Sequence, residues 1–303
     1  MEVLTYFDWK DTLDTLGMCI QMAGKVMLER KPQEPEWEAV TLKVTPTGLT
    51  TGSIPCENGL FQIDFDFVIH QMSITNEEGK TEAIKFIDGV SVSEYYKEFL
   101  TKMELLGCRT DIYPIPQEWS FTKSFKEDVT HKTYDRTKVE KAFKMVKFAY
   151  SLLDKYAAPF RGKRSGINFW WGTCDMGATR YSGKLVPLNP QLPPGYRYGV
   201  DAELIEVGFN FGNGLVPEPY FFGFIFPGSP EYATSKIEPE QSFFKEGQYI
   251  YKLWDAMNTQ NPEENILKFF QEVYRIGTQV QKWENLDVLN KPLEMPLQKP
   301  HRN

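Results

Sequence analysis

One alternating stretch limits the fold more than any other part of the chain. From Leu60 to His70 every second residue is apolar, namely Phe61, Ile63, Phe65, Phe67 and Ile69. The residues between them are Gln62, Asp64, Asp66, Val68 and His70. Because successive side chains of a strand point to opposite faces, this pattern predicts a strand with one buried face. Such a strand is typical of an antiparallel sheet that is solvated on its other side.

Helices are expected on both sides of this strand region. Apolar residues at helical spacing predict a helix over residues 11–30, which Pro32 ends. Ser91-x-x-Glu94 is a capping box, and the helix that it begins is closed by Gly107. The strands expected between these helices cover residues 40–44, 49–53, 60–70 and 82–87.

The second half of the chain repeats this order. Thr137-x-x-Glu140 predicts the start of a long helix, and Asn261-Pro262 predicts the start of the last one. The strands expected between them cover residues 167–175, 180–182, 203–211 and 220–226. We therefore predict an α+β fold of two packed halves, each a helix, an antiparallel β-meander and a second helix.

The predicted domain organisation is a single compact domain over residues 1–303. The alternative is a pair of half-units, 1–116 and 134–303, joined by a long connector. That connector, Ile115–Tyr134, and the Pro- and Gly-rich stretch Leu185–Val200 are long enough to be lids or binding loops.

Composition excludes several classes of function. The 34 basic and 41 acidic residues give a net charge of −7, which disfavours nucleic-acid binding. The 4 cysteines form no CxxC pair and only 3 histidines are present, so we expect no metal site and no cofactor. The sequence shows neither a signal peptide nor an apolar run of membrane-spanning length. These features predict a reduced, cytoplasmic protein with a small-molecule ligand and no membrane partner; they specify no oligomeric state.

The stretch from Asn168 to Lys184 carries the most varied chemistry. We expect two short strands around a turn at residues 176–178, which would place Asp175 across from Arg180. Arg180 would then hold an anionic substrate group, and Asp175 would act as a base or orient the arginine. The alternative is a buried structural ion pair that pins the hairpin.

The same stretch offers further ligand contacts. Trp170 and Trp171 should point to opposite faces, one into the core and the other into a pocket wall. Ser182 adds a hydroxyl to the substrate-binding candidates.

Three candidates lie outside this stretch. Glu206, among apolar neighbours, should have a raised pKa that suits a general acid, or else pair across strands with Arg180 or Lys184. His131 is either a proton shuttle or a turn element. Asp66 shares a predicted strand face with other polar residues; this face could present metal ligands or a carboxylate pair, or could simply face solvent.

The whole chain also resembles a widespread family of conserved bacterial proteins known only as a domain of unknown function. The resemblance rests mainly on Trp171-Gly172-Thr173, Asp175 and the run Thr179-Arg180-Tyr181-Ser182-Gly183-Lys184. The family tends to carry His at the position of Asn168, so the resemblance gives this chain no metal or acid/base role there. It implies no activity.

The function expected from these residues is that of an enzyme acting on a small polar or anionic organic molecule by carboxylate and arginine acid/base chemistry, without a nucleotide cofactor. The catalytic candidates are Asp175, Glu206, His131 and Asp66, and the substrate-binding candidates are Arg180, Trp170, Trp171 and Ser182. The alternatives are a non-catalytic binding or sensor module, and a protein-interaction scaffold that docks through Tyr220–Phe226.

Overall fold

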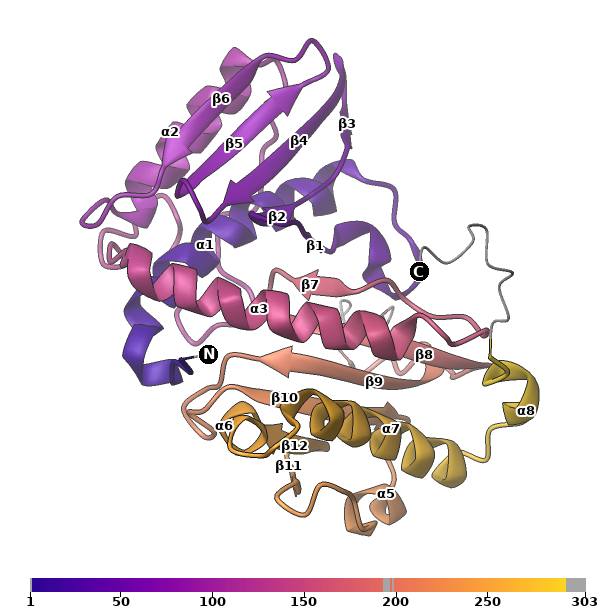
Figure 1. The fold of residues 1–303 in the computed structure, drawn as a ribbon. Coiled ribbons are helices and arrows are strands. Elements are labelled where there is room, and N and C mark those ends of the chain that lie inside the picture. Colours follow the sequence, from indigo (N-terminus) through magenta and orange to yellow (C-terminus); the bar gives the residue numbers. More distant parts are fainter. Residues whose placement is uncertain (1, 193–196, 198, 293–303) are drawn as a thin grey trace, which may run out of the picture.

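Two antiparallel sheets organise the protein in a computed structural model that describes residues 2–192, 197 and 199–292. The first sheet has the strand order β1-β2-β4-β5-β6, and β3 pairs with β4 (Figure 1). Its strands are β1 (Lys43–Val44), β2 (Gly48–Thr50), β3 (Ile54–Cys56), β4 (Gly59–Asp66), β5 (Gln71–Asn76) and β6 (Thr81–Lys85). The apolar residues Phe61, Ile63 and Phe65 of β4 are buried, as their alternation predicts.

The second sheet has the strand order β11-β12-β10-β9-β8-β7. Its strands are β7 (Asn168–Trp170), β8 (Asp175–Leu185), β9 (Ala202–Asn210), β10 (Tyr220–Phe226), β11 (Phe243–Lys245) and β12 (Gln248–Lys252). Figure 1 shows α3 and α7 running across this sheet, and both helices contact β9, so they cover one of its two faces.

The helices fill the space around and between the sheets. Their bounds are α1 (Tyr6–Arg30), η1 (Pro35–Val40), α2 (Val92–Leu105), α3 (Arg136–Ala157), α5 (Pro230–Thr234), α6 (Leu253–Met257), α7 (Pro262–Val280) and α8 (Leu286–Leu289). Together these elements confirm the predicted α+β class.

Most of helix α1 is buried on all sides. Every residue from Thr12 to Met27 is buried, including the polar Asp14, Gln21 and Lys25. The helix contacts α2 and α3, and its Trp9 ring meets Phe211 edge to face at 4.9 Å. A helix enclosed in this way belongs to the core of the whole molecule and not to one surface of it.

The two sheets meet at one short backbone contact. Leu42 and Phe169 form an antiparallel bridge in which each backbone N–H donates to the other residue's carbonyl, at 3.0 and 2.9 Å. β1 and β7 therefore lie next to each other, although more than a hundred residues separate them in the chain.

Several predicted boundaries are confirmed and others are wrong. Ser91 caps α2 in a capping box with Glu94, and α7 begins at Pro262. Asp135, and not Thr137, caps α3, because its side chain accepts the Lys138 N–H. The strand expected over residues 60–70 ends at Asp66, where a tight turn begins.

Candidate functional site

The candidate site is a cavity of about 390 Å³ on the face of the second sheet opposite α3 and α7. Strands β8, β9 and β10 contribute Asp175, Glu206, Asn210, Tyr220, Phe222 and Phe224 to it. These side chains share a face because Asn210 pairs with Tyr220, Gly208 with Phe222 and Glu206 with Phe224. The remaining described lining residues are Leu28, Trp37, Val40, Gln117, Glu118, Trp170, Trp171, Gly172, Thr173, Gly199, Val200 and Gln248.

Two glycines in the sheet leave space beneath this cavity because they have no side chain. Gly177 of β8 and Gly208 of β9 are directly paired across the sheet. A Cβ atom on Gly177 would lie 2.3 Å from Oε1 of Glu206, and one on Gly208 would lie 2.2 Å from the Phe222 ring. The absent side chains therefore make room for the Glu206 carboxyl group and the Phe222 ring.

Asp175 and Glu206 point into the cavity from the same face. Asp175 accepts a hydrogen bond from Oγ1 of Thr173, and Glu206 accepts one from Oγ1 of Thr179 at 3.0 Å. The Glu206 carboxyl lies over Gly177, whose α carbon is about 6.6 Å along β8 from that of Asp175. One small molecule can therefore reach both groups.

The environment separates the pKa values of these two acids. Burial raises the pKa of Asp175 to about 6, against hydrogen bonds from Thr173 and Asn210 that lower it. Burial, together with the negative charge of Asp175, raises the pKa of Glu206 to about 8. At neutral pH Asp175 is therefore mainly ionised and Glu206 mainly protonated, as required of a base and an acid that act together.

A third carboxyl group, that of Glu118, comes from the connector between α2 and α3. Gln21 of α1 holds this segment, since it donates to the Gln117 carbonyl and accepts from the Gln117 N–H. The Trp119 indole donates to the Gly172 carbonyl at 2.6 Å. Desolvation and the charge of Asp175 raise the pKa of Glu118. The connector thus places an acidic group against the turn at residues 171–174.

Tryptophan side chains form much of the wall. Trp170 and Trp171 both border the cavity, whereas the sequence predicts that only one of them does so. Trp171 lies in the turn after β7 and packs on Gly24 of α1, where a Cβ atom would meet its ring at 2.2 Å. Trp37 of η1 adds a further ring.

Arg180 is not part of this cavity. The expected turn at residues 176–178 is wrong, because the turn spans 171–174 and residues 176–178 lie inside β8. Asp175 and Arg180 therefore point to opposite faces of the sheet. The guanidinium of Arg180 stacks on Tyr156 of α3 and Tyr274 of α7. The ion pairs of Arg180 that were considered, with Asp175 and with Glu206, are therefore not formed.

Three other candidates have local partners away from the cavity. His131 contacts Asp128 through Nδ1 at 2.6 Å, and its ring packs against that of Phe121. Asp66 accepts the N–H groups of Val68 and Ile69 and so closes the turn after β4. The Ser182 hydroxyl accepts the Lys184 N–H at a bulge of β8.

The predicted polar face of β4 keeps Asp64 and Asp66, which both lie in the strand, but it does not include His70. His70 lies in the turn with a φ of 56° and is buried, and its ring contacts the Tyr134 hydroxyl at 3.0 Å and Glu140 at 3.2 Å. In the described part of the chain, no three His, Cys, Asp or Glu side chains come together in a way that could hold a metal ion.

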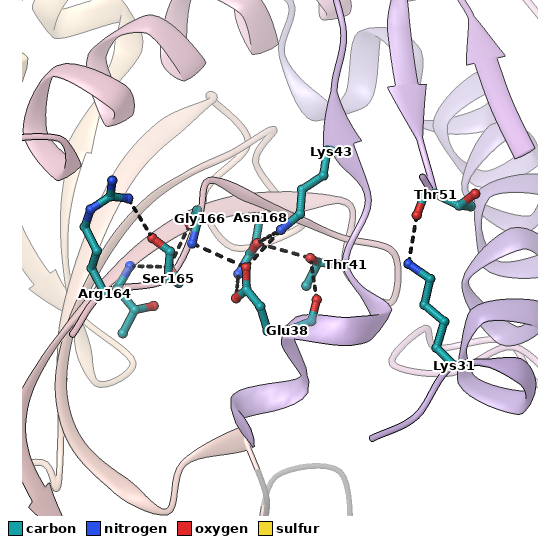
Figure 2. Close-up of polar contacts among 10 residues, drawn as sticks. Lys31, Glu38, Thr41, Lys43, Thr51, Arg164, Ser165, Gly166 and Asn168 are labelled. Atoms are coloured by element: carbon teal, nitrogen blue, oxygen red, sulfur yellow. Dashed lines mark hydrogen bonds and ion pairs between the residues drawn. The ribbon is translucent and has the colours of Figure 1, made fainter. Parts of the chain in front are cut away.

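Asn168 lies in a polar network that joins the two sheets beside the cavity (Figure 2). Its Oδ1 accepts from the Thr41 hydroxyl at 3.1 Å and from Nζ of Lys43, and its amide donates to Glu38 at 2.6 Å. All of its polar atoms are thus used in structural contacts, as expected of a buried amide.

A family model matches residues 1–289, nearly the whole chain, and its description is a family of unknown function, DUF5996. The chain belongs to this family. Membership in DUF5996 confirms the resemblance to a domain of unknown function. Comparison with curated proteins and with solved structures finds no match. None of the helices in the described residues is long and apolar enough to cross a membrane.

Several residues around the cavity are not predicted from the sequence. Glu118 lies in the connector between α2 and α3, and Trp37 lies in the short 3-10 helix η1, where periodicity gives no signal. Lys25 packs against residues that line the cavity and is 2% exposed. Its Nζ donates to Oε1 of Gln117 at 2.7 Å and lies 5.7 Å from the Trp171 ring centre. Burial lowers the pKa of Lys25 to about 8. The sequence does contain a signal for Lys25, because it is a charged residue in a helix whose other residues are typical of a buried core.

Proposed function

We propose that the cavity between β7, β8, β9 and β10 is the active site of an enzyme that moves protons on a small polar organic molecule. The observation that supports this most is that Asp175 and Glu206 enter one cavity from the same face of the sheet, where burial raises the pKa of both carboxyl groups. Environments that shift the pKa values of two neighbouring carboxyl groups by different amounts are typical of acid/base sites.

The charge of the cavity favours a neutral or cationic substrate over an anionic one. Apart from Tyr220, the ionisable side chains among the described lining residues are the carboxyl groups of Glu118, Asp175 and Glu206. An anionic group placed among them would be repelled, whereas hydroxyl, amide and ammonium groups would find acceptors. The tryptophan rings supply flat apolar surface for the remainder of the molecule.

The proposed chemistry uses the two acids in turn. Ionised Asp175 takes a proton from one atom of the bound molecule, and protonated Glu206 gives a proton to another, so that the substrate is isomerised or a leaving group departs. The enzyme is left with Asp175 protonated and Glu206 ionised. Proton exchange with water at the mouth of the cavity then restores the starting state. Hydrolysis fits the same pair if Asp175 deprotonates a water molecule.

A binding or sensor function is the second candidate, and the aromatic wall supports it. Trp37, Trp170 and Trp171 stand beside three carboxyl groups in the same cavity. This combination suits an organic ammonium ion held by ring faces and carboxylates without any reaction. In either function we propose a cytoplasmic protein with a small-molecule ligand and without a nucleic-acid partner.

A metabolite screen tests the proposal. Molecules that raise the melting temperature of the wild-type protein would be selected and then followed for turnover by NMR. Turnover that falls at least about 100-fold in Asp175→Asn and in Glu206→Gln is expected of an acid/base pair. The matched control is Glu203→Gln, on the same strand but outside the described lining. Binding without turnover would support the sensor function, and full turnover in both acid variants would refute the proposal.

A further inference from the structure

Arg180 presents a buried positive charge without an anionic partner. The residue is 3% exposed, and no Asp or Glu of the described chain forms an ion pair with it. One Nη donates to the Tyr156 carbonyl, and Nε is buried without any hydrogen-bond partner. Of its five N–H donors, some are taken by the Tyr156 carbonyl and the Tyr274 hydroxyl, and the one on Nε has no partner.

Neighbouring groups compensate only part of this charge. The guanidinium carbon lies 3.8 Å from the Tyr156 ring centre, 4.6 Å from that of Tyr274 and 4.9 Å from that of Phe160. The Tyr156 carbonyl belongs to the last turn of α3, where the helix dipole favours a cation. Ring faces and a helix terminus are weaker partners for a guanidinium than a carboxylate is.

The guanidinium borders a cavity of about 530 Å³ between α3, α7 and α8. Phe160, Tyr274 and Asn290 line it beside Arg180, and the Tyr274 hydroxyl donates to Oδ1 of Asn290 at 3.0 Å. Arg275 also lines the cavity, but Glu272 neutralises it through two hydrogen bonds of 2.8 Å. Arg180 is therefore the cation in this described lining that has no acidic partner.

We propose that this second cavity binds a small organic monocarboxylate, with its carboxylate on Arg180 and its apolar part against Phe160 and Tyr274. A single unpaired guanidinium matches the single charge and the planar shape of a carboxylate, which it can hold with two parallel hydrogen bonds. The doubly charged form of inorganic phosphate would need further donors.

This site is separate from the cavity that contains Asp175 and Glu206. Arg180 pairs with Ile205 across β8 and β9, whereas the adjacent pair Thr179 and Glu206 points to the opposite face. The two cavities share no lining residue in the described chain. The carboxylate site consequently does not depend on the acid/base proposal.

Calorimetric titration with benzoate tests this site. Wild-type protein should bind one benzoate per chain, and Arg180→Gln should weaken binding at least about tenfold. Gln271→Trp, an exposed substitution at the cavity rim that leaves Arg180 in place, should weaken binding as well. Arg275→Gln is the matched control, and its affinity should stay within about threefold of wild type.

Four results would overturn the proposal. They are the absence of saturable benzoate binding to wild-type protein, unchanged affinity in a folded Arg180→Gln variant, unchanged affinity in Gln271→Trp, and tighter binding of inorganic phosphate than of benzoate. If Arg180→Gln does not fold, the comparison of Gln271→Trp with Arg275→Gln decides the question without it.

Discussion

The carboxyl group of Glu206 occupies the space that a side chain on Gly177 would fill: a Cβ atom there would lie 2.3 Å from Oε1 of Glu206. The glycine on one strand therefore sets the position of the acid on the next. It also brings that acid toward Asp175, whose charge helps to raise the pKa of Glu206.

Gly177→Ala should disturb the site without unfolding the protein. The atom that the new methyl group meets is the end of a flexible side chain, so we expect a stability loss within about 1 kcal/mol and a clear loss of ligand binding. Gly208→Ala is the contrasting variant, because its Cβ would meet the backbone oxygen of Met176 at 2.4 Å. It should cost about 1–3 kcal/mol or more in urea unfolding. Equal losses of stability in the two variants would contradict this account of the two glycines.

Glu206→Gln should change how stability depends on pH. Burial raises the pKa of Glu206 from its ordinary value of 4.5 to about 8 in the folded protein. Between these two pH values the folded state keeps a proton that the unfolded state releases, so wild-type stability falls as pH rises. Glutamine lacks this proton, and the variant should gain on the order of 3 kcal/mol relative to wild type from pH 4.5 to pH 8. A constant difference in urea unfolding over this range would show that the Glu206 pKa is not raised.

Lys25→Met should have its effect at higher pH. Burial lowers the pKa of Lys25 to about 8 from 10.5, so between these values the unfolded state binds the extra proton and the stability of the wild type rises with pH. Methionine removes this contribution. Relative to wild type, the variant should lose on the order of 3 kcal/mol between pH 8 and pH 10.5, measured by urea unfolding. If the difference between the two proteins does not change with pH, Lys25 is not desolvated.

The fragment of residues 1–116 should not fold alone. It would expose the side of α1 that packs on Trp171 and Phe211, and it would leave Leu42 without its backbone partner Phe169. Circular dichroism should show no cooperative thermal transition for this fragment. A cooperative transition would instead support two independent half-units.

The sequence predicts elements well where their signals are local. The capping box at Ser91, the start of α7 at Pro262 and the alternation in β4 depend on neighbouring residues, and all three are confirmed. Prediction from sequence fails where the surroundings of an element are set by segments far away in the chain. α1 appears amphipathic in sequence, yet every residue from Thr12 to Met27 is buried.

The candidate site shows the same difference between local and long-range signals. The sequence predicts a pocket with Asp175, Glu206 and one of the two tryptophans, and the cavity in the structure is lined by both acids and by both Trp170 and Trp171. The position of Arg180 was predicted wrongly because moving a turn by a few residues changes which side chains face each other. Glu118 reaches the cavity only through the long-range contacts of Gln21 and Trp119, for which the sequence has no local signature.

The most direct test of the acid/base account is a carbon-13 NMR titration of the side-chain carboxyl groups, assigned with Asp175→Asn and Glu206→Gln. The account predicts that Asp175 titrates near pH 6 and Glu206 near pH 8, so that one is ionised and the other protonated at neutral pH. Titration of both groups near the ordinary carboxyl value of about 4 would contradict it.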